Sequence, residues 1–146
     1  MNKDWFKEYC EKNIDEQEVL FEYCLDDECK ILLIEYSRFK NVIELLSKDI
    51  DSLQNEFANS INVADEIALL FDDECKFLAG ILLKNNIINK EVYYEVMQID
   101  KLLSEMSDEH NINNWTVEAM NNDMRWTLSK KIANDIICGL PDCKTF

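Results

Sequence analysis

Apolar residues recur at steps of three and four along most of the chain, which is the spacing that places them on one face of an α-helix. Glycine occurs only at Gly80 and Gly139, and the single proline is Pro141. The turn residues that a sheet protein needs at short intervals are therefore missing. The pattern predicts an all-α fold, with residues 1–146 forming a single-domain bundle of about five to seven helices.

The first half of the chain predicts three of these helices. A short helix covers residues 3–12. A longer one begins at Asp15, whose spacing from Glu18 matches a capping box. No strong helix breaker follows until about Phe57, so we expect a break near Tyr36–Asn41. The segment after that break carries one apolar stripe, made of Phe39, Val42, Leu46, Ile50, Leu53 and Phe57.

Asparagines mark the boundaries of the next two helices. Asn62 and Asn89 are placed to cap the start of each helix, and Lys84-Asn85-Asn86 ends the first of them. The stripe of the first helix is Ala64, Ile67, Ala68, Phe71, Cys75, Leu78 and Leu82. The stripe of the second is Val92, Val96, Ile99, Leu103 and Met106.

A last helix is predicted from about Trp115 to Cys138, where Gly139-Leu140-Pro141 stops it. Trp126 falls off its main stripe and is expected to face a neighbouring element. The residues expected to be buried along this helix are Val117, Met120, Met124, Leu128, Ile132 and Ile136.

The sequence DDECK occurs twice, at Asp26–Lys30 and at Asp72–Lys76, 46 residues apart. Two interpretations stay open: a duplicated helical hairpin, or a coincidence in an acidic chain. No third copy follows, although a solenoid needs at least about three repeats, and this favours the coincidence.

Negative charge is concentrated in the first half of the chain. The sequence holds 15 Lys and Arg against 30 Asp and Glu, a formal net charge of −15. Residues 1–75 contain 20 of the acids but only 7 of the bases. Helical spacing places Glu18, Glu22 and Asp26 on one face, where like charges repel. Stability and solubility alone give no reason for this concentration.

Composition also bounds the class of protein. An apolar content of 47% is too high for a disordered acidic tail. No stretch of about 18 apolar residues occurs, which argues against a membrane span, and the acidity argues against direct binding of nucleic acid. The N-terminal segment lacks the apolar core of a secretion signal, so we expect a cytoplasmic protein with six reduced cysteines. Frequent Asn, Ile and Lys favour a bacterial origin.

No catalytic or metal-binding motif emerges, and we expect neither an enzyme nor a cofactor. The only histidine, His110, lies in a polar stretch typical of an exposed loop. One histidine cannot supply the paired Glu-x-x-His motifs of a di-metal bundle, and the acidic triplets lack the glycine of a calcium loop. Cys24-x4-Cys29 and Cys138-x4-Cys143 offer four thiols, but a five-residue step on a helix points the Cys24 and Cys29 side chains apart.

Size, acidity and the absence of catalytic motifs make the chain similar to small acidic inhibitors of basic effectors, a functional class that includes immunity proteins of bacterial toxin systems. We therefore expect an immunity- or antitoxin-like protein that neutralises a basic toxin domain, a nuclease being the favoured type. Two alternatives are a helical adaptor with an apolar groove and a nucleic-acid-mimicking inhibitor of a DNA- or RNA-binding protein. The expected partner-binding residues are Trp5, Asp15, Glu16, Glu18, Glu22, Asp26, Asp27 and Glu28, joined by Asp72, Asp73 and Glu74 if their helices are adjacent.

Overall fold

The chain folds into helices and turns, with no strand among the residues described by this computed structural model, 4–57 and 61–143. The α-helices are α1 (Trp5–Glu11), α2 (Ile14–Val19), α3 (Asp27–Ser47), α4 (Ile50–Glu56), α5 (Val63–Leu70), α6 (Lys76–Lys84), α7 (Lys90–Asp108), α8 (Val117–Asn122) and α9 (Met124–Gly139). Two π-helical segments, η1 (Leu20–Cys24) and η2 (Phe71–Cys75), and one 3-10 turn, η3 (Ile112–Trp115), complete them. The predicted all-α class is confirmed.

The helix count is close to the prediction. Segment η1 continues α2, and η2 joins α5 to α6 in one continuous helix. If these are counted as single helices and η3 is left out, the described residues form eight helices instead of five to seven. None of them combines the length and the apolar content that crossing a bilayer would require.

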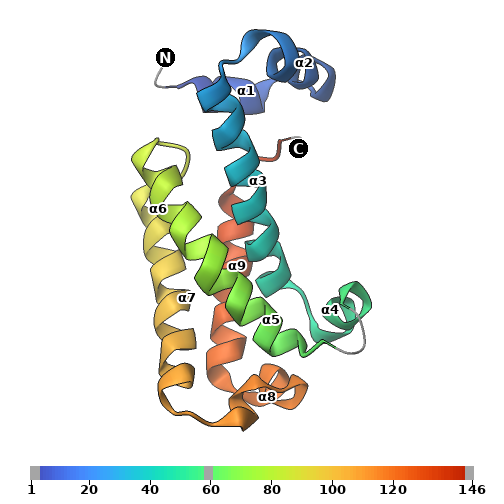
Figure 1. The fold of residues 1–146 in the computed structure, drawn as a ribbon, viewed down its shortest axis with the longest axis vertical. Coiled ribbons are helices and arrows are strands. Elements are labelled where there is room, and N and C mark those ends of the chain that lie inside the picture. The colour runs from blue at the N-terminus through green and yellow to red at the C-terminus, as the bar shows by residue number, and fades with distance from the viewer. Residues whose placement is uncertain (1–3, 58–60, 144–146) are drawn as a thin grey trace.

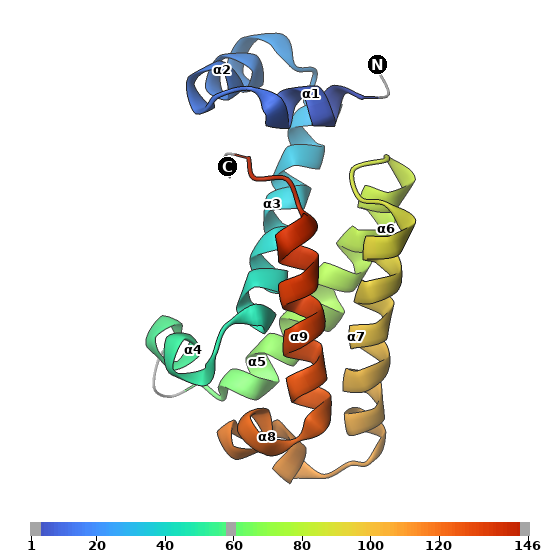
Figure 2. The same cartoon turned by 180° about the vertical axis from the view of Figure 1, so that it is seen from behind.

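Four long helices form the body of the molecule. Helix α9 packs against α3 and α7 on one side, and the α5–η2–α6 helix crosses α3 and α7 on the other (Figures 1 and 2). Helices α1 and α2 lie over the N-terminal end of α3, whereas α4 and α8 lie at the opposite end (Figure 1). The bundle therefore presents two ends, each covered by short helices, and a flank where α5–η2–α6 crosses α7.

The predicted apolar stripes of the central helices meet in one core. Ile67 and Leu82 of the α5–η2–α6 helix and Ile99 of α7 are fully buried, as is Ile43 of α3. The predicted boundaries are confirmed as well: the side chains of Asn62 and Asn89 accept hydrogen bonds from backbone N–H groups of the first helical turns. The chain leaves α6 through Asn86, which adopts the left-handed conformation with φ of 61°.

The predicted start and break of the first long helix are wrong. Asn13, not Asp15, caps α2, because its side chain and that of Glu16 form the capping pair. Helix α3 runs unbroken through the segment 36–41, and the chain breaks instead before Asp27 and after Ser47. At both breaks an aspartate, Asp26 or Asp49, accepts a hydrogen bond from a backbone N–H and starts a new helix.

The last predicted helix is also divided. Asp123 ends α8 and caps α9. The buried residues of α9 therefore do not continue the three- and four-residue spacing of the half-buried residues in α8. Met124 and Leu128, which were expected in the core, are 67% and 40% exposed. Trp126 is buried instead, and its indole N–H donates to the carbonyl oxygen of Asn114 at 2.9 Å. Trp126 therefore contacts a neighbouring element, as predicted, and does so within the core.

The two DDECK copies adopt different structures. In the first copy Asp26 is the N-cap of α3, and the helix begins at Asp27. In the second copy Asp72, Asp73 and Glu74 lie inside the π-helical segment η2. Because the same residues sit at a helix start in one place and within a helix in the other, the structure favours a coincidence over a duplicated hairpin.

Candidate protein-binding surface

Helices α1 and α2 and segment η1 form a corner on top of α3, called here the acidic end (residues 5–24) (Figure 1). The buried Gln17 side chain holds the corner, because its amide donates to the carbonyl oxygens of Tyr9 at 3.2 Å and Lys12 at 3.0 Å. The Phe6 ring packs edge-on against Tyr36 of α3, with centroids 4.9 Å apart. These contacts satisfy the last carbonyls of α1 and fix the acidic end to the bundle.

Four of the predicted site residues lie on α2 and η1. Asp15, Glu16, Glu18 and Glu22 are all exposed. Within the described ranges, no Lys or Arg nitrogen lies at ion-pair distance from the carboxylates of Asp15, Glu16 or Glu22. The structure therefore brings these carboxylates together on a short stretch of helix without neutralising them.

The next three predicted residues have a local structural role. Asp26, Asp27 and Glu28 are exposed at the N-terminal end of α3, where negative charge complements the helix dipole. The pKa of Asp26 is lowered because its carboxylate accepts hydrogen bonds from Cys29. The start of α3 thus accounts in part for the acidic residues at these three positions.

The second acidic triplet lies away from the first. Segment η2 packs against α3, and of this triplet Glu74 forms an ion pair there, with its carboxylate 3.0 Å from Arg38. The ten residues from Glu28 to Arg38 correspond to about 15 Å along the axis of α3. Asp72 pairs with Lys76 at 3.7 Å, and Asp73 is exposed. The second triplet thus lies almost three turns of α3 away from the first, and its part in the predicted surface stays a prediction.

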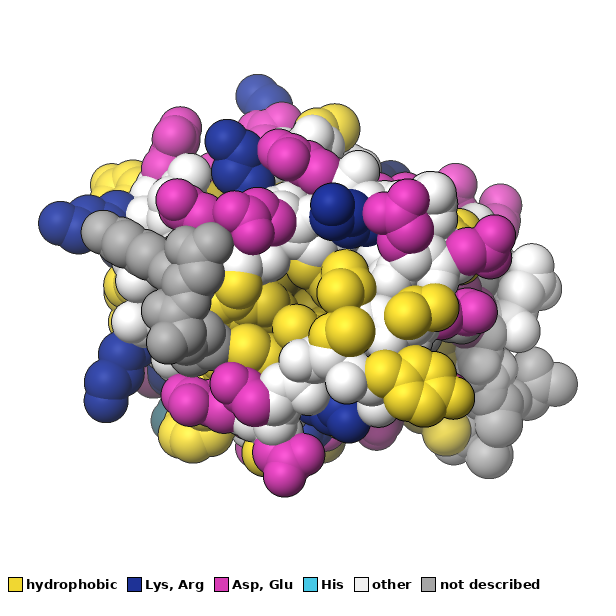
Figure 3. Space-filling view, turned by 90° about the horizontal axis from the view of Figure 1, so that it is seen from above, with side chains coloured by type: hydrophobic (Ala, Val, Ile, Leu, Met, Phe, Trp, Pro, Cys, Tyr) yellow, Lys and Arg dark blue, Asp and Glu magenta, His cyan; other side chains and the backbone are white. Residues whose placement is uncertain are grey.

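Apolar side chains are exposed between the carboxylates of the acidic end. Ile14 is 62%, Val19 54% and Tyr23 79% exposed. A shallow apolar hollow lies against Val19 and Leu20 and is bordered by Lys12, Asp15 and Glu16. Figure 3, which looks down on this end of the molecule, shows hydrophobic side chains gathered in a hollow with mostly acidic side chains around it.

Trp5 was the apolar residue predicted for this surface, but the structure exposes other apolar residues there. Trp5 is only half-buried, but it packs edge-on against Phe6 at 5.8 Å and contacts the core. Ile14, Val19 and Tyr23 were missed, although apolar residues that alternate with exposed acids on a short helix are a signal for such a surface.

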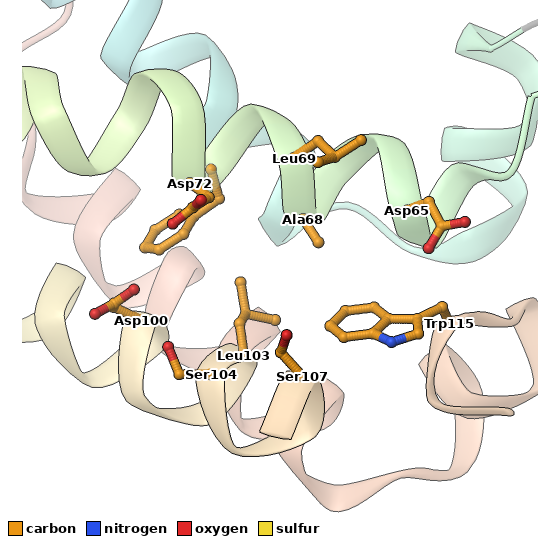
Figure 4. A pocket seen from close by; sticks show the side chains of 10 residues that line it. Asp65, Ala68, Leu69, Asp72, Asp100, Leu103, Ser104, Ser107 and Trp115 are labelled. Atoms are coloured by element: carbon orange, nitrogen blue, oxygen red, sulfur yellow. The ribbon is translucent and has the colours of Figure 1, made fainter. Parts of the chain in front are cut away.

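A second hollow is a groove of about 370 Å³ between the α5–η2 helix, α7 and Trp115 (Figure 4). Its floor is apolar, and Leu103 and the Trp115 indole project into it (Figure 4). Asp72 and Asp100 lie at one end, where both bind Lys76, at 3.7 and 3.3 Å, and raise its pKa. Asp65 borders the groove near Trp115 without an ion pair in the described part of the chain.

Only Asp72 of this groove was among the predicted site residues. Leu69, which is 55% exposed, lies off the buried stripe of its own helix, and that is the one signal in the sequence that points here. Asp65, Asp100 and Trp115 come from three separate elements, so their meeting depends on the tertiary fold.

Residues with potential for catalysis or metal binding are dispersed. His110 is exposed, as predicted, with a left-handed backbone conformation of φ 52° after α7. In each predicted cysteine pair the two thiols differ: Cys24 and Cys138 are exposed, Cys29 is buried and Cys143 half-buried. Across residues 4–57 and 61–143, no three His, Cys, Asp or Glu side chains are grouped to hold a metal ion.

Comparisons with protein-family models, with curated proteins and with solved structures found no match to this chain. The acidic end and the groove beside Trp115 are therefore the features from which a function can be inferred.

Proposed function

We propose that the protein is an immunity- or antitoxin-like inhibitor that binds a basic toxin domain, such as a nuclease, through its acidic end. One observation carries the proposal: exposed apolar side chains and unneutralised carboxylates share the short α2–η1 helix. In a protein–protein interface, apolar and aromatic side chains supply the anchoring contacts. Carboxylates accelerate the encounter with a basic partner and fix its orientation.

The arrangement suits an inhibitor better than a merely soluble surface. Solubility alone would favour carboxylates without exposed Ile14, Val19 and Tyr23 beside them. The acidic end also projects from the bundle, so a partner can contact it without disturbing the core (Figures 1 and 2). A nuclease blocked here would meet carboxylates where it normally binds phosphates.

The test begins with the genes that neighbour the gene for this chain. Each neighbouring product is expressed alone and together with this protein, and growth of the host cells is measured. We expect one basic product to arrest growth and this protein to restore it. If no neighbouring product is toxic, or if co-expression restores growth with none, the proposal is wrong.

The acidic end is then tested with the rescued pair. A triple variant, Asp15→Asn with Glu16→Gln and Glu22→Gln, removes three charges, while the amide introduced in place of Glu16 can still accept the capping hydrogen bond from Asn13. The association rate constant, measured by surface plasmon resonance at low salt, is expected to fall about tenfold or more. The matched control removes three exposed charges at the opposite end, Glu105→Gln, Asp108→Asn and Glu118→Gln, and is expected to bind nearly as fast as the wild type.

The groove of Figure 4 supports a second candidate function, a helical adaptor that binds a basic amphipathic segment of a partner protein. Asp65, Asp72 and Asp100 border its apolar floor, against a single Lys76. The variant Leu69→Asp places a charge at the exposed edge of the groove. If this variant abolishes binding while the triple variant of the acidic end does not, the adaptor function replaces the inhibitor proposed above.

A further inference from the structure

Cys10 and Cys143 are far apart in the sequence but meet in the fold. Cys10 lies in the last turn of α1, and Cys143 lies in the segment that follows α9. Both are half-buried against the core, and Cys10 lines the same cavity as Pro141 and Asp142, the two residues before Cys143. The Cys10 thiol donates a hydrogen bond to the Cys143 sulfur. Two side chains separated by nearly the whole chain are thus paired thiol to thiol.

Two contacts with α3 fix the segment that carries Cys143. The Tyr36 hydroxyl donates to the carbonyl oxygen of Pro141 at 2.5 Å. The Lys40 ammonium lies 3.0 Å from the Asp142 carboxylate, and its side chain is only 11% exposed. Phe6 of α1 packs on the same Tyr36 ring, so α1 and the segment after α9 share one support on α3.

The surroundings make the two thiols unequal. The pKa of Cys143 is lowered, because the Cys10 thiol donates a hydrogen bond to its thiolate and the Lys40 ammonium lies nearby. The pKa of Cys10 is raised well above its usual value by that same hydrogen bond and by burial. The other ionisable groups near the pair are Asp142, Glu11, Tyr9 and Tyr36. The directions of both pKa shifts and the nearby Lys40 ammonium favour Cys143 as the thiolate and Cys10 as the thiol.

A cavity gives a small oxidant access to Cys10 and to the two residues that precede Cys143. A cavity of about 400 Å³ lies between α1, the α6–α7 connection and the segment after α9, and Cys10, Pro141 and Asp142 are among its lining residues. Hydrogen peroxide is small enough to enter a space of this size.

We propose that Cys10 and Cys143 form a redox-active dithiol that closes to an intramolecular disulfide when hydrogen peroxide is present. The Cys143 thiolate attacks one peroxide oxygen, the O–O bond breaks, and a sulfenic acid forms as hydroxide leaves and takes up a proton. The Cys10 sulfur then attacks the Cys143 sulfur, and the S–O bond breaks. The departing hydroxide takes the proton of Cys10 and leaves as water. Two thiols lose two electrons, and one peroxide becomes two waters.

The disulfide ties the acidic end to the segment that leaves α9. In the reduced protein, α1 is held there by packing and hydrogen bonds. In the oxidised protein the link closes nearly the whole chain into one covalent loop. Oxidation therefore fixes α1 in place, independently of which partner the acidic end binds.

The experiment treats the reduced, full-length protein with a small excess of hydrogen peroxide and alkylates the remaining thiols after denaturation. We expect two of the six cysteines to escape alkylation, and tryptic peptide 8–12, which carries Cys10, to be joined to peptide 132–144, which carries Cys138 and Cys143, with fragmentation placing the link at Cys143. The oxidised chain is also expected to migrate faster on a non-reducing denaturing gel. Cys10→Ser and Cys143→Ser abolish this species, whereas Cys24→Ser and Cys138→Ser, which replace exposed cysteines, leave it unchanged.

Lys40→Met tests the ammonium as a positioning group. This near-isosteric change is expected to slow disulfide formation about tenfold at pH 7 and to move the pH profile of the rate upward. If all six thiols of the wild type stay alkylatable, or if fragmentation places the link at any cysteine other than Cys10 and Cys143, the dithiol proposal is overturned. Because the peptide map is made on the wild type, its result does not depend on whether each variant folds.

Discussion

The bundle and the acidic end use charge in opposite ways. In the bundle, carboxylates are matched to cations: Arg38 binds Glu74, and Arg125 binds both Glu109 and Asp123. At the acidic end, the described residues place no cation within ion-pair distance of Asp15 or Glu22, and apolar side chains stay exposed among the acids.

The difference shows which parts of this sequence serve folding. The bundle buries its apolar stripes and pairs several of its carboxylates with Arg or Lys, and both features support the marginal stability of a small protein. At the acidic end, Gln17, Leu20 and Phe21 anchor the α2–η1 helix. Ile14, Val19 and Tyr23 stay exposed, so they contribute little to folding and are available for a partner. Substitutions in the two regions should therefore differ in their effect on stability, and the variants below are ordered by the size of that effect.

The largest contrast is expected between core and surface truncations. Ile99→Ala removes a fully buried side chain from α7, so the free energy of unfolding is expected to fall by about 2–5 kcal/mol. Val19→Ala, at a 54% exposed position of the acidic end, is expected to change it by less than about 0.5 kcal/mol. Urea denaturation followed by circular dichroism measures both, and similar losses would contradict the division between bundle and acidic end.

A smaller loss is expected from the buried polar contacts at the end of α7. The buried Asn114 amide donates to the carbonyl oxygen of Met106 at 3.1 Å and to the Glu109 carboxylate at 2.8 Å. Asn114→Ala removes both hydrogen bonds, although Arg125 still binds the Glu109 carboxylate, and is expected to cost about 1–3 kcal/mol. Asn113→Ala, at the exposed neighbouring position, is the control in the same urea experiment. Equal values for both variants would mean that the Asn114 contacts do not hold the bundle.

The Arg125 cluster makes part of the stability of the bundle dependent on pH. Hydrogen bonds from Arg125 lower the pKa of both Glu109 and Asp123. A carboxyl group whose pKa is lower in the folded than in the unfolded protein stabilises the folded state at pH values above its unfolded-state pKa, near 4. This stabilisation is lost as the pH falls through the folded-state pKa. Arg125→Met is therefore expected to destabilise the folded protein at pH 7, and to destabilise it much less at pH 2.

The measurement is thermal unfolding across that pH range. Lys131→Met, which removes an exposed cation from the same helix, provides the control and is expected to lack this pH dependence. A deficit of Arg125→Met that stays constant from pH 7 to pH 2 would show that packing, not charge, accounts for it.

The smallest effect has the opposite sign. Burial and the neighbouring carboxylates of Glu91 and Asp135 raise the pKa of Glu95. A carboxyl group whose pKa is higher in the folded than in the unfolded protein favours the folded state at pH values below its unfolded-state pKa, near 4. This advantage is lost as the pH rises through the folded-state pKa. Glu95→Gln is thus expected to add a few tenths of a kcal/mol at pH 7 and nothing at pH 3. Glu105→Gln, at an exposed position of α7, is the control, and a loss of stability in Glu95→Gln at pH 7 would reject this explanation.

Sequence patterns predict the central helices well because their signals are local. Asn62 and Asn89 cap helices, and the residues at steps of three and four after them are buried. Aspartates mislead, because in an acidic chain the cap residues Asp26, Asp49 and Asp123 look like any solvent-exposed acid. Because the cap at Asp123 was missed, the predicted buried face of α9 was wrong: Leu128 was expected in the core, whereas Trp126 is buried there.

The candidate site was predictable only in part. The exposure of Asp15, Glu16, Glu18 and Glu22 follows from composition and helical spacing. The distance between the two acidic triplets depends on where η2 crosses α3, and the pairing of Cys10 with Cys143 depends on how two chain segments meet. Neither is written in a local pattern.

The tryptophans divide between the two ends of the molecule. Trp5 lies in α1, whereas Trp115 and Trp126 pack edge-on, 6.0 Å apart, where η3 and α8 meet the start of α9. Replacing Trp5 with Phe, or the other pair with Phe, leaves emission from one end alone. The protein thus carries its own optical reporters, and their fluorescence distinguishes an event at α1 from one at the far end of the bundle without any attached dye.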